Sequence, residues 1–224
     1  GMINKLKTKT STETYYLTNW IDVGKFSNPK LETHKYLSTA SFKILYSGNI
    51  GAKQDWVFFI EFLNQLKEID NVEVIVVGEG AEKENLLQKI KNYTFVKHYN
   101  LVPYDELPSL LSGADLHILF QKTDVIDTVM PSKILGMMAS AKPSIVTGNL
   151  KSEVATVFKD SEGGFYFDGK SIEHIINKII LLKGNKKMCL ELGENAKAYV
   201  EEKYSKDKVL NKFINQLNNL CYEK

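Results

Sequence analysis

The feature that most constrains the fold is a regular alternation of short apolar runs with longer amphipathic stretches, which begins at Phe42. The stretch from Trp56 to Leu66 places its apolar residues at helical spacing, and the run from Val72 to Val77 reads VEVIVV. Strand patterns that alternate with helical patterns predict a parallel sheet with helices on both faces. Near-continuous apolar strands agree with burial on both sides. The sequence therefore predicts an α/β fold of three layers, α/β/α, around a mostly parallel sheet.

The chain is predicted to divide into a leader and one domain. Residues 1–14 are rich in Lys, Thr and Ser and show no periodicity, which predicts a flexible leader, and residues 15–224 form the domain. An aromatic segment at 15–20 predicts a short strand at the start of that domain. Further strands are predicted at 42–46, 72–77, 94–99, 115–120, 143–147 and 164–167. Helices are predicted at 56–66, 86–90, 104–111, 132–139 and 152–158, with a helical C-terminal tail at 172–182, 186–203 and 206–220.

Composition limits the classes of partner. The 224 residues are 43% hydrophobic, which is enough for a core, and the formal net charge of +2 gives no reason to expect nucleic acid. No apolar run approaches the length of about 18 residues that indicates a membrane-spanning helix. All 29 basic residues are lysines, so a phosphate site would use ammonium groups, hydroxyls and backbone N–H groups without guanidinium. The 2 cysteines lie outside any metal-type spacing, which favours a reduced, cytoplasmic compartment.

Loops that follow strands are predicted to meet at the carboxyl edge of the sheet, where open α/β sheets bind their ligands. The loop Gly48–Gln54 has glycines that allow close approach of a ligand, and the helix after it would offer free N–H groups to an anion. In the turn Val77–Gly80, Gly78 is the better candidate for a ligand contact. The segment Pro131–Lys133 places a hydroxyl and an ammonium at a helix start. Each pattern also fits an ordinary turn or helix start, so none predicts a function alone.

No catalytic constellation stands out in the sequence. There is no Ser/His/Asp arrangement, no metal-ligand cluster and no close pair of carboxylates, and His98 and His117 fit core or edge positions of strands. The catalytic residues therefore stay unassigned, and no metal or other cofactor is expected. The last helix has an apolar side that fits either docking onto its own domain or contact with an anionic membrane.

The loops and their neighbours form an ordered series of short motifs. The series comprises Asn19–Asp22, Lys43–Gln54, Val76–Gly80, Asn100–Pro108, Ala114–Leu116, Met130–Lys133, Ala139–Pro143, Ser152–Glu153 and Leu192–Ala196. In this order and spacing the series resembles the nucleotide-sugar-binding C-terminal domain of family 4 (group 1) glycosyltransferases, in the subgroup that acts in colanic acid and capsule synthesis. The resemblance covers residues 15–220.

The resemblance implies a fold and a function. Members of this family have the GT-B fold, in which two Rossmann-like domains face one cleft, and this chain resembles the half that holds the donor. It implies a glycosyltransferase that uses a nucleoside-diphosphate sugar, UDP- or GDP-linked, in the synthesis of cell-surface polysaccharide or glycolipid, with retention at the anomeric carbon. It also implies an N-terminal acceptor domain supplied in cis or in trans. The expected location is cytoplasmic, including the inner face of the membrane, where the complete enzyme would make peripheral contact.

The resemblance also implies roles for individual residues. The first loop approaches the donor diphosphate, with Lys53 or Gln54 at its basic position. The segment 100–102 reads the base through its backbone, Leu107 lines the base pocket, and the helix start at 131–133 faces the diphosphate or ribose. Together with Gly78, the expected donor-binding residues are Gly48, Asn49, Gly51, Lys53, Gln54, Asn100, Leu101, Val102, Leu107, Pro131, Ser132 and Lys133.

The chain departs from the common family pattern at several positions. Many relatives have Arg at the position of Asn49, Lys at that of Gln54, and two glutamates that would fall at Thr128 and Gly136. The Pro-Ser-Lys subgroup also lacks the glutamate pair. The departures therefore imply either a different way of binding the donor or weak or absent catalysis.

Two alternatives to a complete transferase remain open. The first is a non-catalytic subunit that binds a nucleotide sugar and needs a separate acceptor-domain protein. The second is a GT-B-fold nucleotide-sugar epimerase. An epimerase needs catalytic carboxylates and a histidine that have no clear place in this sequence, so this alternative is the weaker one.

Overall fold

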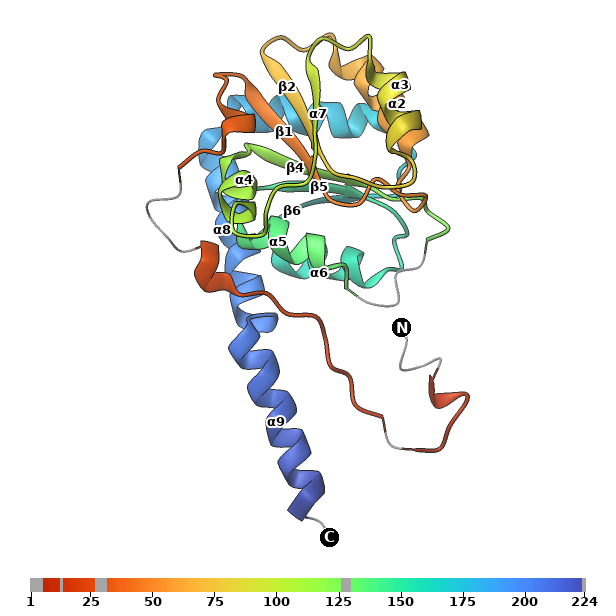
Figure 1. The fold of residues 1–224 in the computed structure, drawn as a ribbon, viewed down its shortest axis with the longest axis vertical. Coiled ribbons are helices and arrows are strands. Elements are labelled where there is room, and N and C mark those ends of the chain that lie inside the picture. The colour runs from red at the N-terminus through yellow and green to blue at the C-terminus, as the bar shows by residue number, and fades with distance from the viewer. Residues whose placement is uncertain (1–5, 13, 27–31, 126–129, 223–224) are drawn as a thin grey trace.

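A six-stranded parallel sheet forms the centre of the computed structural model, which describes residues 6–12, 14–26, 32–125 and 130–222 (Figure 1). The strands are β1 (Phe42–Ser47), β2 (Val72–Val77), β3 (Val96–Tyr99), β4 (Leu116–Phe120), β5 (Ser144–Thr147) and β6 (Gly164–Phe167). Their order across the sheet is β3-β2-β1-β4-β5-β6, and each pair is parallel. This is the order of the doubly wound α/β fold, so the predicted fold class is confirmed.

Helices cover both faces of the sheet. They are α2 (Trp56–Leu66), α3 (Lys83–Ile90), α4 (Leu107–Gly113), α5 (Ser132–Ala139), α6 (Glu153–Ser161), α7 (Ile172–Gly184), α8 (Lys186–Lys203) and α9 (Lys206–Tyr222), with 3-10 turns η1 (Val23–Phe26) and η2 (Lys35–Leu37). Helices α2, α3 and α7 lie on one face and α4, α5 and α6 on the other, while α8 packs against α5 and α6 (Figure 1).

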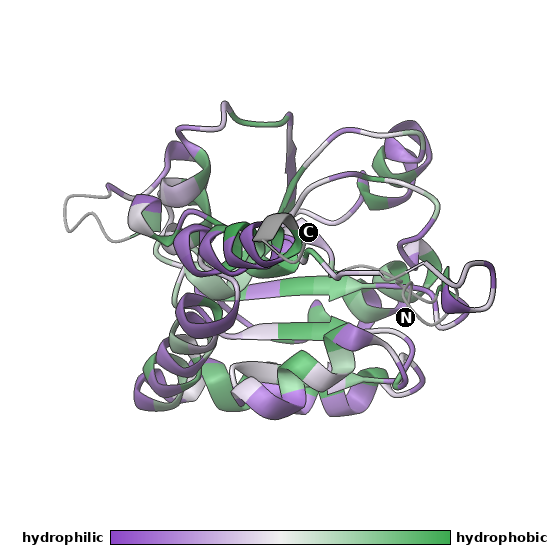
Figure 2. Cartoon of the chain, turned by 90° about the horizontal axis from the view of Figure 1, so that it is seen from below, coloured by the Kyte–Doolittle hydropathy of each residue, from purple (hydrophilic) through white to green (hydrophobic). Residues whose placement is uncertain are grey.

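The buried side chains of β1 show how the sheet divides the core. Ile44 and Tyr46 join the apolar cluster that includes α2, whereas Leu45 joins the cluster that includes Leu110 and Leu111 of α4. Successive strand residues point to opposite faces, so a continuous apolar run serves both clusters. Figure 2 shows hydrophobic residues concentrated along the strands.

Several helices begin where a polar side chain caps their first turn. Asp55 accepts a hydrogen bond from Phe58 N at the start of α2, Ser152 caps α6, and Asn185 caps α8. The helix predicted from residue 104 begins only at Leu107, because the segment before it turns back on itself through a hydrogen bond from Glu106 N to Pro103 O at 3.1 Å.

The strand predicted at 15–20 is wrong, because the described residues of this segment join no sheet. The chain instead pairs at Ile21 with the junction of α8 and α9. Ile21 N donates to Tyr204 O, and Lys206 N donates to Ile21 O, both at 2.9 Å. The division into a leader at 1–14 and a domain at 15–224 stays a prediction.

Helix α9 leads away from the sheet (Figure 1). Val209, near its start, is buried, whereas Ile214 is 50% exposed and Leu217 is 44% exposed. Within the described part of the chain, no helix is long and apolar enough to cross a membrane. The apolar side of α9 is thus covered only in its first turns.

Candidate functional site

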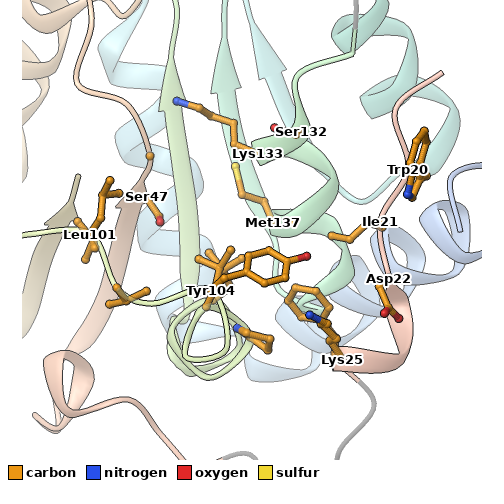
Figure 3. Close-up of a pocket in the computed structure, with 18 of the residues that line it drawn as sticks. Trp20, Ile21, Asp22, Lys25, Ser47, Leu101, Tyr104, Ser132, Lys133 and Met137 are labelled. Carbon is orange, nitrogen blue, oxygen red and sulfur yellow. The ribbon is translucent and has the colours of Figure 1, made fainter. Parts of the chain in front are cut away.

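A cavity of about 710 Å³ opens at the carboxyl edge of the sheet, where the strand order reverses between β1 and β4 (Figure 3). Its walls come from segments far apart in the sequence. They are the segment Trp20–Phe26, the turn Ser47–Asn49 after β1, the loop and helix start at 101–108, one side of α5, and Lys206. Open α/β sheets bind ligands at this place.

The cavity brings together much of the predicted site. Its lining includes the predicted residues Gly48, Asn49, Leu101, Val102, Leu107, Ser132 and Lys133. The predicted residues Gly51, Lys53, Gln54, Gly78, Asn100 and Pro131 are not part of that lining. The structure thus brings together the turn after β1, the segment 101–107 and the start of α5. Several other predicted residues of these loops do not line the cavity.

The loop after β1 is fixed by hydrogen bonds within the protein. Gly48 N donates to Val77 O at 2.9 Å, and Ile50 N donates to Glu79 O at 2.8 Å. Gln54 is buried, and its Oε1 accepts from Gly51 N at 3.0 Å. Lys53 is exposed. These backbone N–H groups are therefore already satisfied, and the loop serves as a rigid wall of the cavity.

The start of α2 differs from the expectation of free N–H groups for an anion. The carboxylate of Asp55 accepts from Phe58 N at 3.0 Å and so occupies the place where an anion would bind. Asp55 N also donates to Phe120 O at 2.9 Å, which ties this helix start to the end of β4. Helix α2 is thus capped from within the chain.

Close packing accounts for Gly78. A Cβ built on Gly78 would lie 2.1 Å from the backbone oxygen of Gly48, so only glycine allows the turns after β1 and β2 to meet. Asn100 is exposed, and its Oδ1 accepts from Lys83 Nζ at 3.2 Å. Of the segment 100–102, Leu101 and Val102 line the cavity, and the predicted reading of the base by the backbone of this segment stays a prediction.

The start of α5 faces the cavity without a side-chain cap. Pro131 is the N-cap residue and makes no side-chain hydrogen bond, and Ser132 and Lys133 form the first turn. Ile134 N donates to Pro131 O at 3.0 Å, and the helix dipole adds partial positive charge at this end of α5. The partial positive charge of this helix start, the Ser132 hydroxyl and the Lys133 ammonium together suit an anionic ligand.

Lys133 reaches across the edge of the sheet to the end of β1. Its Nζ donates to the hydroxyl of Tyr46 at 3.3 Å and lies 5.1 Å from the centre of the Tyr46 ring. Figure 3 shows Lys133 at one end of the cavity and Asp22 and Lys25 together at the other. The ammonium thus lies beside the loop after β1, although that loop supplies little charge of its own.

Of the two positions where many relatives have glutamate, Gly136 lines the cavity and Thr128 lies outside the described residues. Gly136 is on the inner side of α5, one turn after Ser132. A carboxylate is therefore absent from this point of the wall.

One side of the cavity consists of residues for which the sequence predicts no binding role. That side carries Trp20, Asp22, Lys25 and Lys206. Tyr104 also lines the cavity, and the Nζ of Lys25 lies 4.1 Å from the centre of the Tyr104 ring. These residues reach the cavity because the segment before β1 pairs with the α8–α9 junction. The motif at 19–22 was the available signal, since Asn19 Nδ2 donates to Met130 O at 2.6 Å and ties this segment to the start of α5.

The network beneath α5 contains a buried histidine. His117 Nε2 lies 2.9 Å from Ser140 Oγ, and Ser140 Oγ donates to Met137 O at 2.6 Å. Burial, followed by the charge of Lys142, lowers the pKa of His117 to about 3, so the ring is neutral in the folded protein. His117 thus joins β4 to the end of α5, as expected for a core histidine.

The described residues do not bring three or more His, Cys, Asp or Glu side chains into a group that could hold a metal ion. The charged side chains of the cavity wall are instead Lys25, Lys133 and Lys206 together with Asp22. Lysines outnumber carboxylates in this wall, so its charge favours an anionic ligand.

Comparison with known proteins gives a family match over most of the chain. The model of the family described as "Glycosyl transferases group 1" matches residues 31–199. A curated relative is WcaI of Escherichia coli strain K12, a glycosyl transferase assigned to colanic acid biosynthesis. It is 27% identical over 230 residues, which cover 97% of this chain and 55% of WcaI.

Solved structures share the fold. The C-terminal domain of LpcC, a glycosyl transferase group 1 family protein from Francisella tularensis, has a TM-score of 0.66 at 20% identity and covers 83% of this chain and 99% of that domain. Anabaena HepE in complex with UDP has a TM-score of 0.75 at 16% identity and covers 92% of this chain and 57% of HepE. The chain thus spans about half the length of WcaI and HepE and nearly all of the LpcC domain.

Proposed function

The chain belongs to the glycosyl transferases group 1, and from that membership we propose that it is the donor-binding half of a sugar transferase. Its ligand is a nucleoside-diphosphate sugar with UDP or GDP as the nucleotide. The observation that carries the proposal is the cavity at the carboxyl edge of the sheet, which joins an apolar wall at Leu101, Val102 and Leu107 to a positively charged helix start at Ser132 and Lys133.

The two ends of this arrangement match the two parts of such a ligand. The apolar wall suits the flat faces of a base, and the start of α5 suits the diphosphate. When the sugar leaves, negative charge grows on the nucleoside diphosphate. Lys133 and the first-turn N–H groups of α5 stabilise that charge in the transition state. HepE supports this assignment by analogy of fold, because its structure holds UDP.

A thermal-shift screen tests the proposal. The chain is heated with UDP, GDP, ADP, TDP and their sugars, and with the matching nucleosides and orthophosphate as controls. A ligand at about 100 times its dissociation constant adds roughly 2.7 kcal/mol to stability, which gives a clear rise in the midpoint. We expect one nucleoside diphosphate to raise the midpoint more than its nucleoside does. If no nucleotide raised the midpoint, the result would contradict a donor site formed by this chain alone.

We further propose that an acceptor domain, in cis or in trans, completes the cleft. Tyr15–Leu17 of the first segment and Ile214, Leu217 and Leu220 of α9 are exposed apolar residues, and α9 extends away from the sheet (Figure 1). WcaI is nearly twice as long as the part this chain matches, since that part is 55% of its length. Sugar transfer that appears only when an acceptor-domain protein is added would support this proposal, and transfer by the chain alone would contradict it.

The remaining features of the complete enzyme are proposed from the family resemblance. The reaction retains the configuration at the anomeric carbon and acts in cell-surface polysaccharide or glycolipid synthesis, as the assignment of WcaI to colanic acid synthesis suggests by analogy. It takes place at the cytoplasmic side of the membrane and needs no metal ion, because Lys133 and α5 can balance the charge of the diphosphate. Full nucleotide binding in the presence of EDTA would agree with the last point, and loss of binding would contradict it.

A further inference from the structure

The hydroxyl of Tyr46 connects two segments that line the cavity. It donates a 2.5 Å hydrogen bond to the backbone oxygen of Asn49, and its oxygen accepts from Lys133 Nζ at 3.3 Å. The ammonium, the phenol and the carbonyl therefore form a chain in which each donor points the same way. Such chains polarise their members, so each bond strengthens the next.

The Tyr46 ring is fixed from the side away from the cavity. The residue is only 2% exposed, and its ring meets the edge of Trp56 at a centroid distance of 5.1 Å and an angle of 70°. Trp56 is itself held by a bond from its Nε1 to Gly51 O at 3.0 Å. Burial also raises the pKa of the Tyr46 phenol above its ordinary value, so the hydroxyl keeps its proton. The hydroxyl thus has a fixed place beside Asn49 and Lys133, which line the cavity.

Gly48 provides the space in which the ammonium lies. A Cβ built on Gly48 would lie 3.1 Å from both Cε and Nζ of Lys133. The backbone of Gly48, with φ 134°, is also in a region that favours glycine. Lys133 Nζ is therefore seated beside the Tyr46 ring, within the range of a cation–π contact, and close to the backbone of the loop after β1.

We propose that Tyr46 is a positioning residue that holds the Lys133 ammonium where it meets the diphosphate of the donor. The inference rests on the proposed function, because it takes Lys133 as the cation that binds the diphosphate. A lysine side chain has a long flexible stem, and ordering it on binding costs conformational entropy. Tyr46 lowers this cost by ordering the ammonium before the ligand arrives.

Titration calorimetry with UDP and uridine tests the inference on four proteins: the wild type, Tyr46→Phe, Lys133→Met and the double variant. GDP and guanosine replace this pair where they bind instead. We expect Tyr46→Phe to weaken UDP binding about tenfold, as for loss of a hydrogen bond to a charged group, and to change uridine binding by less than about twofold. In the Lys133→Met background, Tyr46→Phe has no further effect on the ratio of the two affinities.

Tyr166→Phe is the matched control. It removes the same kind of bond, from a phenol to the backbone oxygen of Asn149 at 3.0 Å, in a loop after β5. Tyr166 is not part of the cavity lining, so both affinities should stay at the wild-type value. A general loosening of the protein by loss of a hydrogen-bonded phenol would appear in this variant too.

The possible outcomes separate the inference from the function on which it rests. Equal losses on UDP and uridine in Tyr46→Phe, or a selective loss that persists without Lys133, overturn the positioning role. A loss of UDP binding in Lys133→Met with none in Tyr46→Phe overturns the inference and leaves the proposed function standing. Wild-type protein that binds neither UDP nor GDP overturns both.

Discussion

The two strand-to-helix junctions beside the point of reversal are built in opposite ways. After β1, the backbone N–H groups of Gly48, Ile50 and Gly51 are bonded within the protein, and Asp55 caps the helix that follows. After β4, helix α5 begins at Ser132 with no side-chain cap and carries Lys133 into the cavity. Both junctions contain small polar residues, but the N-cap residue supplies a capping carboxylate at the first and is a proline at the second. The first junction is thus held by bonds within the protein, whereas the second places a lysine ammonium in the cavity wall.

The rigidity of the first junction is tested by Gly78→Ala. The added Cβ would lie 2.1 Å from the backbone oxygen of Gly48, so the two turns must separate. We expect stability to fall by roughly 3 kcal/mol in urea denaturation, which is typical of overpacking at a site that cannot relax. Gly184→Ala is the control, because nothing lies within 4 Å of its added Cβ. Equal stability of the two variants would show that the first junction is not rigid.

The charge of the second junction is tested by Lys133→Met against Lys53→Met. We expect Lys133→Met to weaken nucleoside-diphosphate binding about thirtyfold, the effect of losing a charged hydrogen bond, and to spare the nucleoside. Lys53 is exposed and not part of the cavity lining, so its loss should change affinity by less than about twofold. Calorimetric titration of both variants decides the comparison. A larger effect at Lys53 would assign the charge to the first junction.

Burial of His117 beneath α5 makes the free energy of unfolding depend on pH. The pKa of His117 is lowered from 6.5 to about 3 in the fold, so the unfolded chain takes up a proton first as the pH falls. The contribution of neutral His117 to stability is complete above pH 6.5. As the pH falls from 6.5 to 3, the free energy of unfolding decreases by about 1.4 kcal/mol per pH unit. Denaturation of the wild type and of His117→Gln at several pH values measures the slope. If both proteins show the same slope, His117 is not its source.

The smallest expected effect concerns the cap of the first junction. Asp55→Ala should lower stability by about 1 kcal/mol, because Phe58 N loses its acceptor, and should leave nucleotide affinity unchanged. Asp55→Asn keeps a capping oxygen and should keep most of the stability. Denaturation and a nucleotide titration on each variant give both readouts. Tighter nucleotide binding in Asp55→Ala would mean that the carboxylate had been blocking an anion site at α2.

The parts of the fold that depend on local pattern could be predicted from the sequence. The strand at 72–77 and the helix at 56–66 have the predicted bounds. The spacing of their apolar residues follows from which faces of each element are buried. The aromatic segment at 15–20 was read as a strand, and the error is physical. Its continuation pairs at Ile21 with a helix junction nearly two hundred residues away, which no local pattern records.

The same limit applies to the candidate site. Gly48 and Lys133 were expected near a ligand because they follow strands of an α/β sheet, and Leu107 because of the family resemblance, and all three line the cavity. The direction of a side chain depends on packing, and so Gln54, expected at the ligand, turns inward to Gly51 N. Lys206 reaches the cavity only because α9 starts beside Ile21, a contact that the helical pattern of α9 does not show.

A crystal structure of the chain with the nucleoside diphosphate that binds in the thermal-shift screen tests the central claim most directly. The account predicts the diphosphate at the start of α5, with its oxygens in hydrogen-bonding distance of Lys133 Nζ and Ser132, and the base against Leu101 and Leu107. A diphosphate bound at Lys53, or outside the cavity, would contradict it.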